Sequence, residues 1–142
     1  MKHLIAVLAL AGAFAAQPAT TRAQDFIPGV FDTYEDLAEA MDSSIMAADI
    51  TATLMRFDGG VTSEGEAIDV QRQFTNLFPD GLPNAALVRQ VKYSGGLSRE
   101  LRMYWNRTKY LWVSVLIHDQ GDRVVAIEFS TNTDYDTIAG EF

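Results

Sequence analysis

The second half of the chain alternates apolar and polar residues over four segments, and this pattern predicts an antiparallel sheet. Two of the connections between segments, Ser94-Gly95-Gly96 and Asp119-Gln120-Gly121, end in glycine. Three-residue hairpin loops commonly end in a residue with a left-handed backbone conformation, and glycine adopts that conformation most easily. We therefore predict a meander of four strands, at about residues 85–93, 97–106, 110–118 and 122–131.

The lengths of these loops decide which residues share a face of the predicted sheet. Three-residue loops would pair Tyr93 with Leu97 and His118 with Asp122, which keeps odd-numbered residues on one face throughout. The middle connection, Arg107-Thr108-Lys109, lacks glycine, and its register stays open. The odd face is apolar and is predicted to be the core, covered by helices: Leu87, Val91, Leu101, Met103, Trp105, Leu111, Val113, Val115, Ile117, Val125, Ile127 and Phe129.

Two helices are predicted before the sheet. The first starts at Asp32 or Thr33, either of which can cap it. The second starts at Thr62 or Ser63, and Glu66 stands where the capping-box partner of Ser63 belongs. Apolar residues at helical spacing form one stripe on each helix, namely Leu37, Met41, Ile45 and Ala48 on the first and Ala67, Val70, Phe74, Leu77 and Phe78 on the second.

The segment between these helices is ambiguous. Residues 49–57 could continue the first helix, but Ile50, Ala52 and Leu54 alternate with threonines, which suits a strand. We favour the strand slightly. Asp58-Gly59-Gly60 follows it as a turn.

The first 23 residues have the features of a secretory signal peptide. A basic start at Lys2 precedes an apolar, alanine-rich run over residues 4–16. That run is shorter than the roughly 20 residues of a membrane-spanning helix, and no cysteine follows it for a lipid anchor. We expect a periplasmic or secreted protein without membrane insertion, cleaved after Ala23 or, alternatively, near Ala15 or Ala16.

The predicted organisation is a signal peptide, a flexible leader, one α+β domain and an acidic C-terminal tail, at residues 1–23, 24–31, 32–133 and 134–142. Cleavage after Ala23 would leave 9 of the 11 basic residues and all 19 acidic ones, a net charge of −10. A surface this acidic makes nucleic acid an improbable partner. The chain has no cysteine, which excludes thiol catalysis and thiolate metal sites.

The order of the predicted elements, together with Gly65-Glu66-Ala67-Ile68, the helix end at Leu77-Phe78-Pro79 and the final strand over 121–129, resembles the NTF2-like superfamily. Its SnoaL-like and small periplasmic members are the most similar. The resemblance covers about residues 32–133. It implies a cone-shaped α+β fold, in which N-terminal helices pack on a curved four- to five-stranded antiparallel sheet around a pocket, often with dimers formed through the outer sheet face.

Enzymes of this superfamily usually carry a His–Asp, Asp–Arg or Tyr–Asp set inside the cone. Here the predicted interior is almost wholly apolar, with Arg89 and Arg99 as its main polar residues, so the resemblance favours a non-catalytic member. His118 is the only histidine left after cleavage, and it stands at a strand end beside a turn. We therefore assign no catalytic residue, cofactor or metal.

The alternation of Asn132, Asp134 and Asp136 is superficially like a calcium loop. The following glycine and the distal glutamate of an EF-hand are missing, so we interpret this segment as part of the acidic tail.

The even face of the predicted sheet carries aromatic and charged residues together, which is typical of interfaces. A structural ladder of cross-strand aromatic pairs is the plainer interpretation. We predict a non-catalytic binding or assembly module that forms a homodimer or docks an envelope protein through this face. The interface residues are Arg102, Tyr104, Tyr110, Trp112 and Glu128.

The alternative hypothesis is a small-molecule pocket inside the cone, used for binding or by a SnoaL-like enzyme. Leu37, Met41 and Phe74 would line it with residues of the sheet, and an arginine would meet the acidic group of a hydrophobic carboxylate. The sheet residues of this pocket are Arg89, Arg99, Met103, Trp105 and Phe129.

Overall fold

The computed structural model describes residues 27–57 and 63–142. The predicted signal peptide, with its cleavage after Ala23, and the Asp58-Gly59-Gly60 turn lie outside these residues and stay predictions. Within the described ranges, no helix is both long enough and apolar enough to cross a membrane.

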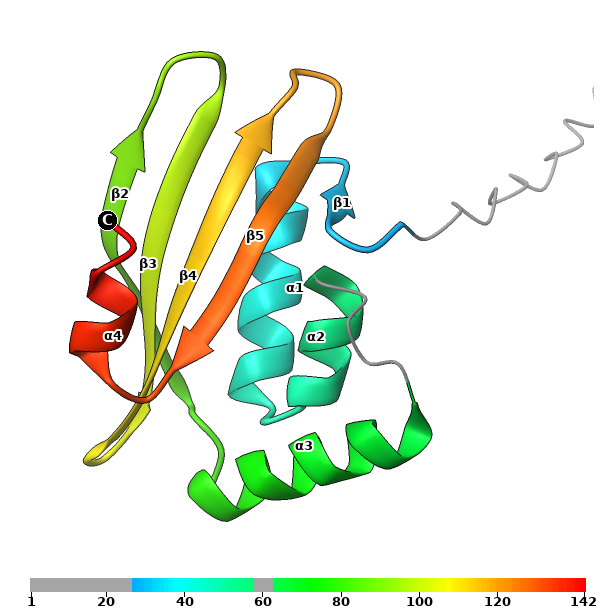
Figure 1. Ribbon diagram of the computed structural model, residues 1–142, viewed down its shortest axis with the longest axis vertical. Coiled ribbons are helices and arrows are strands. Elements are labelled where there is room, and N and C mark those ends of the chain that lie inside the picture. The colour runs from blue at the N-terminus through cyan, green and yellow to red at the C-terminus, as the bar shows by residue number, and fades with distance from the viewer. Residues whose placement is uncertain (1–26, 58–62) are drawn as a thin grey trace, which may run out of the picture.

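The protein has an α+β fold, as predicted, with an open five-stranded antiparallel sheet and helices on both of its faces (Figure 1). Helices α1 and α2 lie against one face, α3 crosses below one end of them, and the short α4 lies on the outer face. The strand order is β1-β5-β4-β3-β2. In chain order the elements are β1 (Val30–Phe31), α1 (Tyr34–Met46), α2 (Ile50–Phe57), α3 (Glu64–Leu77), β2 (Asn84–Lys92), β3 (Leu97–Asn106), β4 (Lys109–Asp119), β5 (Val124–Asn132) and α4 (Tyr135–Ala139).

Helix α1 begins with a capping box, which confirms the predicted start. The Thr33 hydroxyl accepts a hydrogen bond from the Asp36 amide at 3.1 Å, and the Asp36 carboxylate accepts one from the Thr33 amide at 3.1 Å. Two orphan amides of the first turn are satisfied in this way. The predicted apolar stripe is buried in the core at Leu37, Met41 and Ile45.

The predicted strand at residues 49–57 is wrong, because residues 50–57 form helix α2. Ala48 takes a left-handed conformation (φ 58°) that separates the two helices, and the Asp49 carboxylate then accepts the Ala52 amide at 2.9 Å. The buried Thr53 explains the error. Its hydroxyl donates to Ser44 Oγ at 2.8 Å, so a polar residue sits inside and the buried positions follow the helical period, not the alternation.

Helix α3 starts as predicted, since the Ser63 hydroxyl accepts the Glu66 amide at 3.2 Å. Its predicted apolar stripe is buried only in part. Phe74 and the following Phe78 belong to the core, whereas Leu77 is 52% exposed. The helix packs mainly on α2 and lies at the margin of the core, so one edge of the stripe faces solvent.

The lengths of the hairpin loops determine which residues share a face of the sheet. Of the two glycine-ended loops, only one has the predicted length. The Tyr93 amide donates to the Leu97 carbonyl at 2.8 Å, which confirms the three-residue loop between β2 and β3. In the β4–β5 hairpin, Asp119 pairs with Val124, so the predicted pairing of His118 with Asp122 is wrong.

The middle hairpin, between β3 and β4, reverses the predicted faces of β3 relative to β4. Asn106 pairs with Lys109, which leaves a two-residue turn with Arg107 at φ 55°. A shift of one residue moves every side chain of a strand to the other face. In β3 the even residues therefore face the helices, and Leu101, Met103 and Trp105 lie on the outer face, contrary to prediction.

Bulges adjust the two flanking strands. In β5 a bulge at Ile127 lets Ala126 and Phe129 both face the helices, while Ile127 itself is 53% exposed. Val125 was predicted in the core, but Val124 is the residue buried there. In β2 a bulge at Val88 puts Val91 on the outer face, opposite Arg99.

Both ends of the described chain are held by the sheet. We expected a flexible leader up to residue 31, but its described part forms β1, which pairs with β5 and buries Phe31. We expected an acidic tail from residue 134, but α4 packs on the outer face there and buries Ile138. Ser130 Oγ also donates to the Glu141 carboxylate at 2.9 Å. The tail is thus part of the fold.

Gly96 joins the two hairpins that lie at one end of the sheet. It has φ 77°, its carbonyl accepts the Asp119 amide at 2.9 Å, and an added Cβ would lie 2.3 Å from the Asp119 carbonyl oxygen. The adjacent Gly95 has φ 73°, but an added Cβ there would meet nothing within 4 Å. The two glycines thus differ only in the approach of a neighbouring backbone.

We expect Gly96→Ala to lower the free energy of unfolding by about 3 kcal/mol, the upper end of the usual range for one substitution. Gly95→Ala is the matched control and should cost only the left-handed backbone energy, about 1 kcal/mol. Urea unfolding of the two variants measures both values. Equal losses would contradict the described contact between the hairpins.

Candidate functional site

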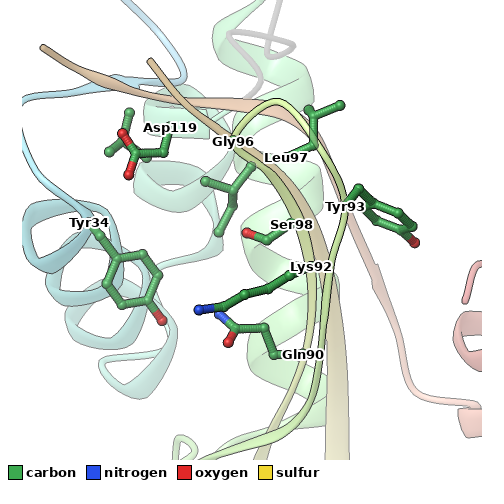
Figure 2. A pocket seen from close by; sticks show the side chains of 10 residues that line it. Tyr34, Gln90, Lys92, Tyr93, Gly96, Leu97, Ser98 and Asp119 are labelled. Atoms are coloured by element: carbon green, nitrogen blue, oxygen red, sulfur yellow. The ribbon is translucent and has the colours of Figure 1, made fainter. Parts of the chain in front are cut away.

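A pocket of about 390 Å³ opens on the helix-facing side of the sheet, at the end where the two hairpins meet (Figure 2). Leu97, Ile117 and Val124 give it an apolar wall. The polar side chains around it come from α1, β2, β3 and β4, and they are Tyr34, Gln90, Lys92, Ser98 and Asp119. Its volume falls within the range of about 300–1,000 Å³ typical of small-molecule sites.

The edge strand β2 supplies the cation of this pocket. Gln90 and Lys92 are two residues apart and therefore share a face, and Lys92 stands opposite Ser98 of β3. Figure 2 shows the Lys92 side chain extending toward Tyr34, while Tyr93 points away from the pocket. Among the described residues, the Lys92 ammonium has no salt bridge or hydrogen bond.

A buried acid lies behind the polar wall. Glu100 is fully buried on β3, and its carboxylate accepts three hydrogen bonds. Tyr34 Oη and Gln90 Nε2 each donate to Oε1 at 2.8 Å, and Arg102 Nε donates to Oε2 at 3.0 Å. Two of the three donors also line the pocket, so Glu100 fixes the positions of Tyr34 and Gln90 there.

Arg102 extends the network toward the middle of α1. Its Nη2 donates to Tyr34 Oη at 2.8 Å and its Nη1 to Asp42 Oδ1 at 3.2 Å. The Tyr104 hydroxyl donates to the same Asp42 oxygen at 2.6 Å. Every buried side-chain polar atom in the described part of the chain has a hydrogen-bond partner. The network is therefore closed on itself.

The network also sets the ionisation of its members. Burial and the hydrogen bond to Asp42 raise the pKa of Tyr104, and burial and Glu100 raise the pKa of Tyr34. Burial alone would lower the pKa of Arg102, but Glu100 and the two tyrosines outweigh it and raise that pKa. At neutral pH both tyrosines are thus neutral donors and Arg102 is a cation.

The structure separates the five residues of the predicted interface. Arg102 and Tyr104 lie on the helix-facing side within the buried network, because the middle hairpin is one residue shorter than its predicted loop. Tyr110 and Trp112 lie together on the outer face, with ring centroids 6.4 Å apart. Glu128 is also on the outer face, where it accepts Arg99 Nη2 at 2.7 Å.

The predicted pocket residues do not line this pocket either. Arg89, Arg99, Met103 and Trp105 lie on the outer face, where both arginines approach the Phe142 ring. Phe129 faces the helices but stacks on Phe57 in the core, with ring centroids 4.9 Å apart. The predicted cone interior thus combined residues from both faces of the sheet.

Sequence reasoning missed Tyr34, Gln90, Lys92 and Glu100. The signal for them was present in β3, where Ser98, Glu100 and Arg102 form a polar row on alternate residues. Reading 107–108 as a two-residue turn would have placed that row on the helix-facing side. A buried charged row then requires partners from a covering helix.

The other residues considered from the sequence have local roles. The His118 ring is half-buried and lies 3.4 Å from Gln120 Nε2. The Asn132 side chain accepts the Asp134 amide, and Asp134 in turn caps α4 by accepting the Asp136 amide at 3.0 Å. Across residues 27–57 and 63–142, no three His, Cys, Asp or Glu side chains gather as a metal site would require.

No family model matches this chain, and the searches of curated proteins and of solved structures returned no match.

The Glu100–Arg102 pair should dominate the electrostatic contribution to stability. Glu100→Ala leaves a buried guanidinium without its main partner, which should lower the free energy of unfolding by about 3 kcal/mol. Glu128→Ala removes a half-exposed carboxylate from Arg99 and should cost less than about 1 kcal/mol. Urea unfolding compares the two, and a loss of similar size in both would contradict a burial effect.

Stability should also fall at alkaline pH. Both network tyrosines have pKa values raised above the ordinary value of 10.0, so they stay protonated in the folded protein where the unfolded chain ionises. Their contribution is complete below about pH 10 and is lost as the pH rises through the raised values.

Urea unfolding over a series of alkaline pH values measures this loss, and Tyr104→Phe should make the decline shallower. Tyr110→Phe, on the exposed outer face, is the control and should leave the decline unchanged. A wild-type stability that stays constant above about pH 10 would be the contrary result.

Proposed function

We propose that this protein is a non-catalytic binding module that takes a small amphipathic anion in the pocket at the hairpin end of the sheet. The observation that carries this proposal is the Lys92 ammonium, which has no ion pair or hydrogen bond within residues 27–57 and 63–142, beside an apolar wall of Leu97, Ile117 and Val124. Such a combination suits a ligand with an apolar body and one carboxylate or similar anionic group.

Two of the five polar residues around the pocket, Lys92 and Ser98, suit the anionic group of such a ligand, whereas the Asp119 carboxylate would repel it. Lys92 supplies charge and up to three donors, and the Ser98 hydroxyl stands opposite it on β3. The overall formal charge of the chain is −8, so a cation in a pocket is a local exception to the charge around it. Charge attraction at this point would orient the anionic end of the ligand.

We propose binding without catalysis because of the surroundings of the two acidic residues at the pocket, Asp119 and Glu100. Asp119, at the rim, accepts the Gly121 amide at 2.8 Å, and Glu100, behind the wall, accepts three donors. A general base needs a free lone pair directed at the ligand. Glu100 is buried behind the wall. Asp119 keeps one oxygen open, but no histidine or second carboxylate stands beside it among the described residues that line the pocket, which favours binding over a SnoaL-like reaction.

The resemblance to the NTF2-like superfamily supports the same proposal, since many of its members bind ligands between a helix and a curved sheet. We extend the proposal to an NTF2-like cone for the fold and to export by the predicted signal peptide. The ligand would then be one that occurs in the periplasm or outside the cell.

Octanoate and octanol form a matched pair of probes, because they share the apolar chain and differ in charge. We expect octanoate to bind more tightly, and Lys92→Gln to weaken it about fivefold, since a partly exposed charge contact contributes about 1 kcal/mol. Octanol should bind the variant and the wild type equally. Isothermal titration calorimetry gives the affinities.

Arg89→Gln is the matched control, because it removes one positive charge from the same strand on the other face of the sheet. It should leave octanoate binding unchanged. Chemical-shift changes on octanoate addition should gather at Gln90, Leu97 and Val124. Equal affinities for octanoate and octanol, or chemical-shift changes centred on the outer face, would contradict the proposal.

A further inference from the structure

The pocket carries a second charged side chain, which a ligand with only an anionic group leaves without a partner. Asp119, at the end of β4, accepts the Gly121 amide at 2.8 Å with Oδ1. Within residues 27–57 and 63–142, its Oδ2 has no ion pair or hydrogen bond. One oxygen of a carboxylate that lines the pocket is therefore free to accept a donor from a ligand.

Lys92 and Asp119 lie on the same face of the sheet and well apart. Lys92 stands opposite Ser98, and Ser98 stands opposite Ile117. Asp119 follows Ile117 by two residues, so its side chain is on the same face. Two strand spacings of about 4.8 Å and two residue steps of about 3.4 Å place the backbone positions of Lys92 and Asp119 about 12 Å apart. Among the described residues, no salt bridge joins these two side chains.

Apolar side chains lie between the two charges. The path from Lys92 to Asp119 across this face passes Ile117, which is buried, and Val124 stands opposite Asp119. Figure 2 shows the Lys92 ammonium and the Asp119 carboxylate toward opposite ends of the pocket, with the Tyr34 ring beside them. The pocket thus presents a cation, an apolar wall and an anion in that order.

We propose that the ligand is an amphipathic zwitterion of the ω-amino carboxylate class, with its carboxylate at Lys92 and its ammonium group at Asp119. This inference rests on the function proposed above, to which it adds the far end of the ligand. An ω-amino carboxylate carries its two charges at the ends of an apolar chain, which matches the order of groups in the pocket. Its ammonium group also offsets the repulsion between Asp119 and the anionic end.

Other classes of small molecule satisfy only part of this arrangement. A simple carboxylate leaves Asp119 facing an apolar chain, and a simple amine leaves Lys92 without a partner. An α-amino acid has its two charges on neighbouring atoms, so it cannot reach both side chains. The two separated charges of the pocket therefore favour one class by contact and disfavour the others by an unmatched charge.

Octanoate and 8-aminooctanoate form a matched pair of probes, because they share the carboxylate and the chain and differ in the terminal ammonium group. Asp119→Asn should change their affinities in opposite directions. It should weaken 8-aminooctanoate about fivefold, as the loss of a partly exposed charge pair does, and strengthen octanoate about twofold by removing a repulsion. The asparagine keeps an oxygen for the Gly121 amide, and isothermal titration calorimetry gives both affinities.

The isomer 2-aminooctanoate tests the spacing of the two charges, because its ammonium group lies beside the carboxylate. We expect it to bind about fivefold less tightly than 8-aminooctanoate, since it lacks the contact with Asp119. Asp119→Asn should leave its affinity unchanged. Equal affinities of the two isomers for the wild type would contradict the proposed placement of the ammonium group.

Asp122→Asn is the control variant, because it removes a carboxylate of the same loop that pairs with Arg123 at 3.1 Å and does not line the pocket. It should leave the affinities of all three probes unchanged. If Asp119→Asn shifts octanoate and 8-aminooctanoate alike, or shifts neither, the zwitterion is wrong, although an octanoate affinity that depends on Lys92 still supports the anion site. An octanoate affinity that does not depend on Lys92 overturns the proposed function and this inference with it.

Discussion

The burial of Glu100 and Arg102 on the helix-facing side of the sheet constrains the rest of the structure. A fully buried carboxylate has to find a cation and donors, and here Arg102, Tyr34 and Gln90 provide them. Tyr34 begins α1 and Asp42 lies two turns further on, so the same network fixes the angle at which α1 crosses the sheet. The edge strand is held as well, through Gln90. The pocket exists beside this network because Tyr34 and Gln90 are held in place as part of its wall.

Much of the fold could be predicted from local chemistry. The caps at Thr33 and Ser63, the β2–β3 loop and the order of two helices before a meander all follow from short-range patterns, and the structure confirms them. Helix α2 could not be predicted from alternation, because the packing of Thr53 against Ser44 is a tertiary contact. The β1 strand likewise depends on β5, which is almost a hundred residues away in sequence.

The site was less predictable than the fold, and the reason is the register of the β3–β4 and β4–β5 hairpins. A two-residue turn at Arg107-Thr108, in place of a three-residue loop, moved Tyr104 and Arg102 inside and Trp105 outside. A bulge at Ile127 then restored apolar residues to the inner face of β5. Neither feature has a glycine to mark it. The predicted aromatic face nonetheless has a counterpart, in which Tyr110 and Trp112 keep their place and Trp105 and Tyr135 take the place of Tyr104.

The two faces of the sheet thus offer two different surfaces, a charged and closed network with a pocket on one side and an aromatic patch on the other. We propose that the pocket holds a small amphipathic anion at Lys92. A crystal structure of the protein grown with octanoate tests it most directly. We expect the carboxylate to lie within hydrogen-bond distance of Lys92 Nζ, with the chain against Leu97, Ile117 and Val124. Octanoate bound only on the outer face of the sheet, beside Tyr110 and Trp112, with the pocket filled by water, would contradict this proposal.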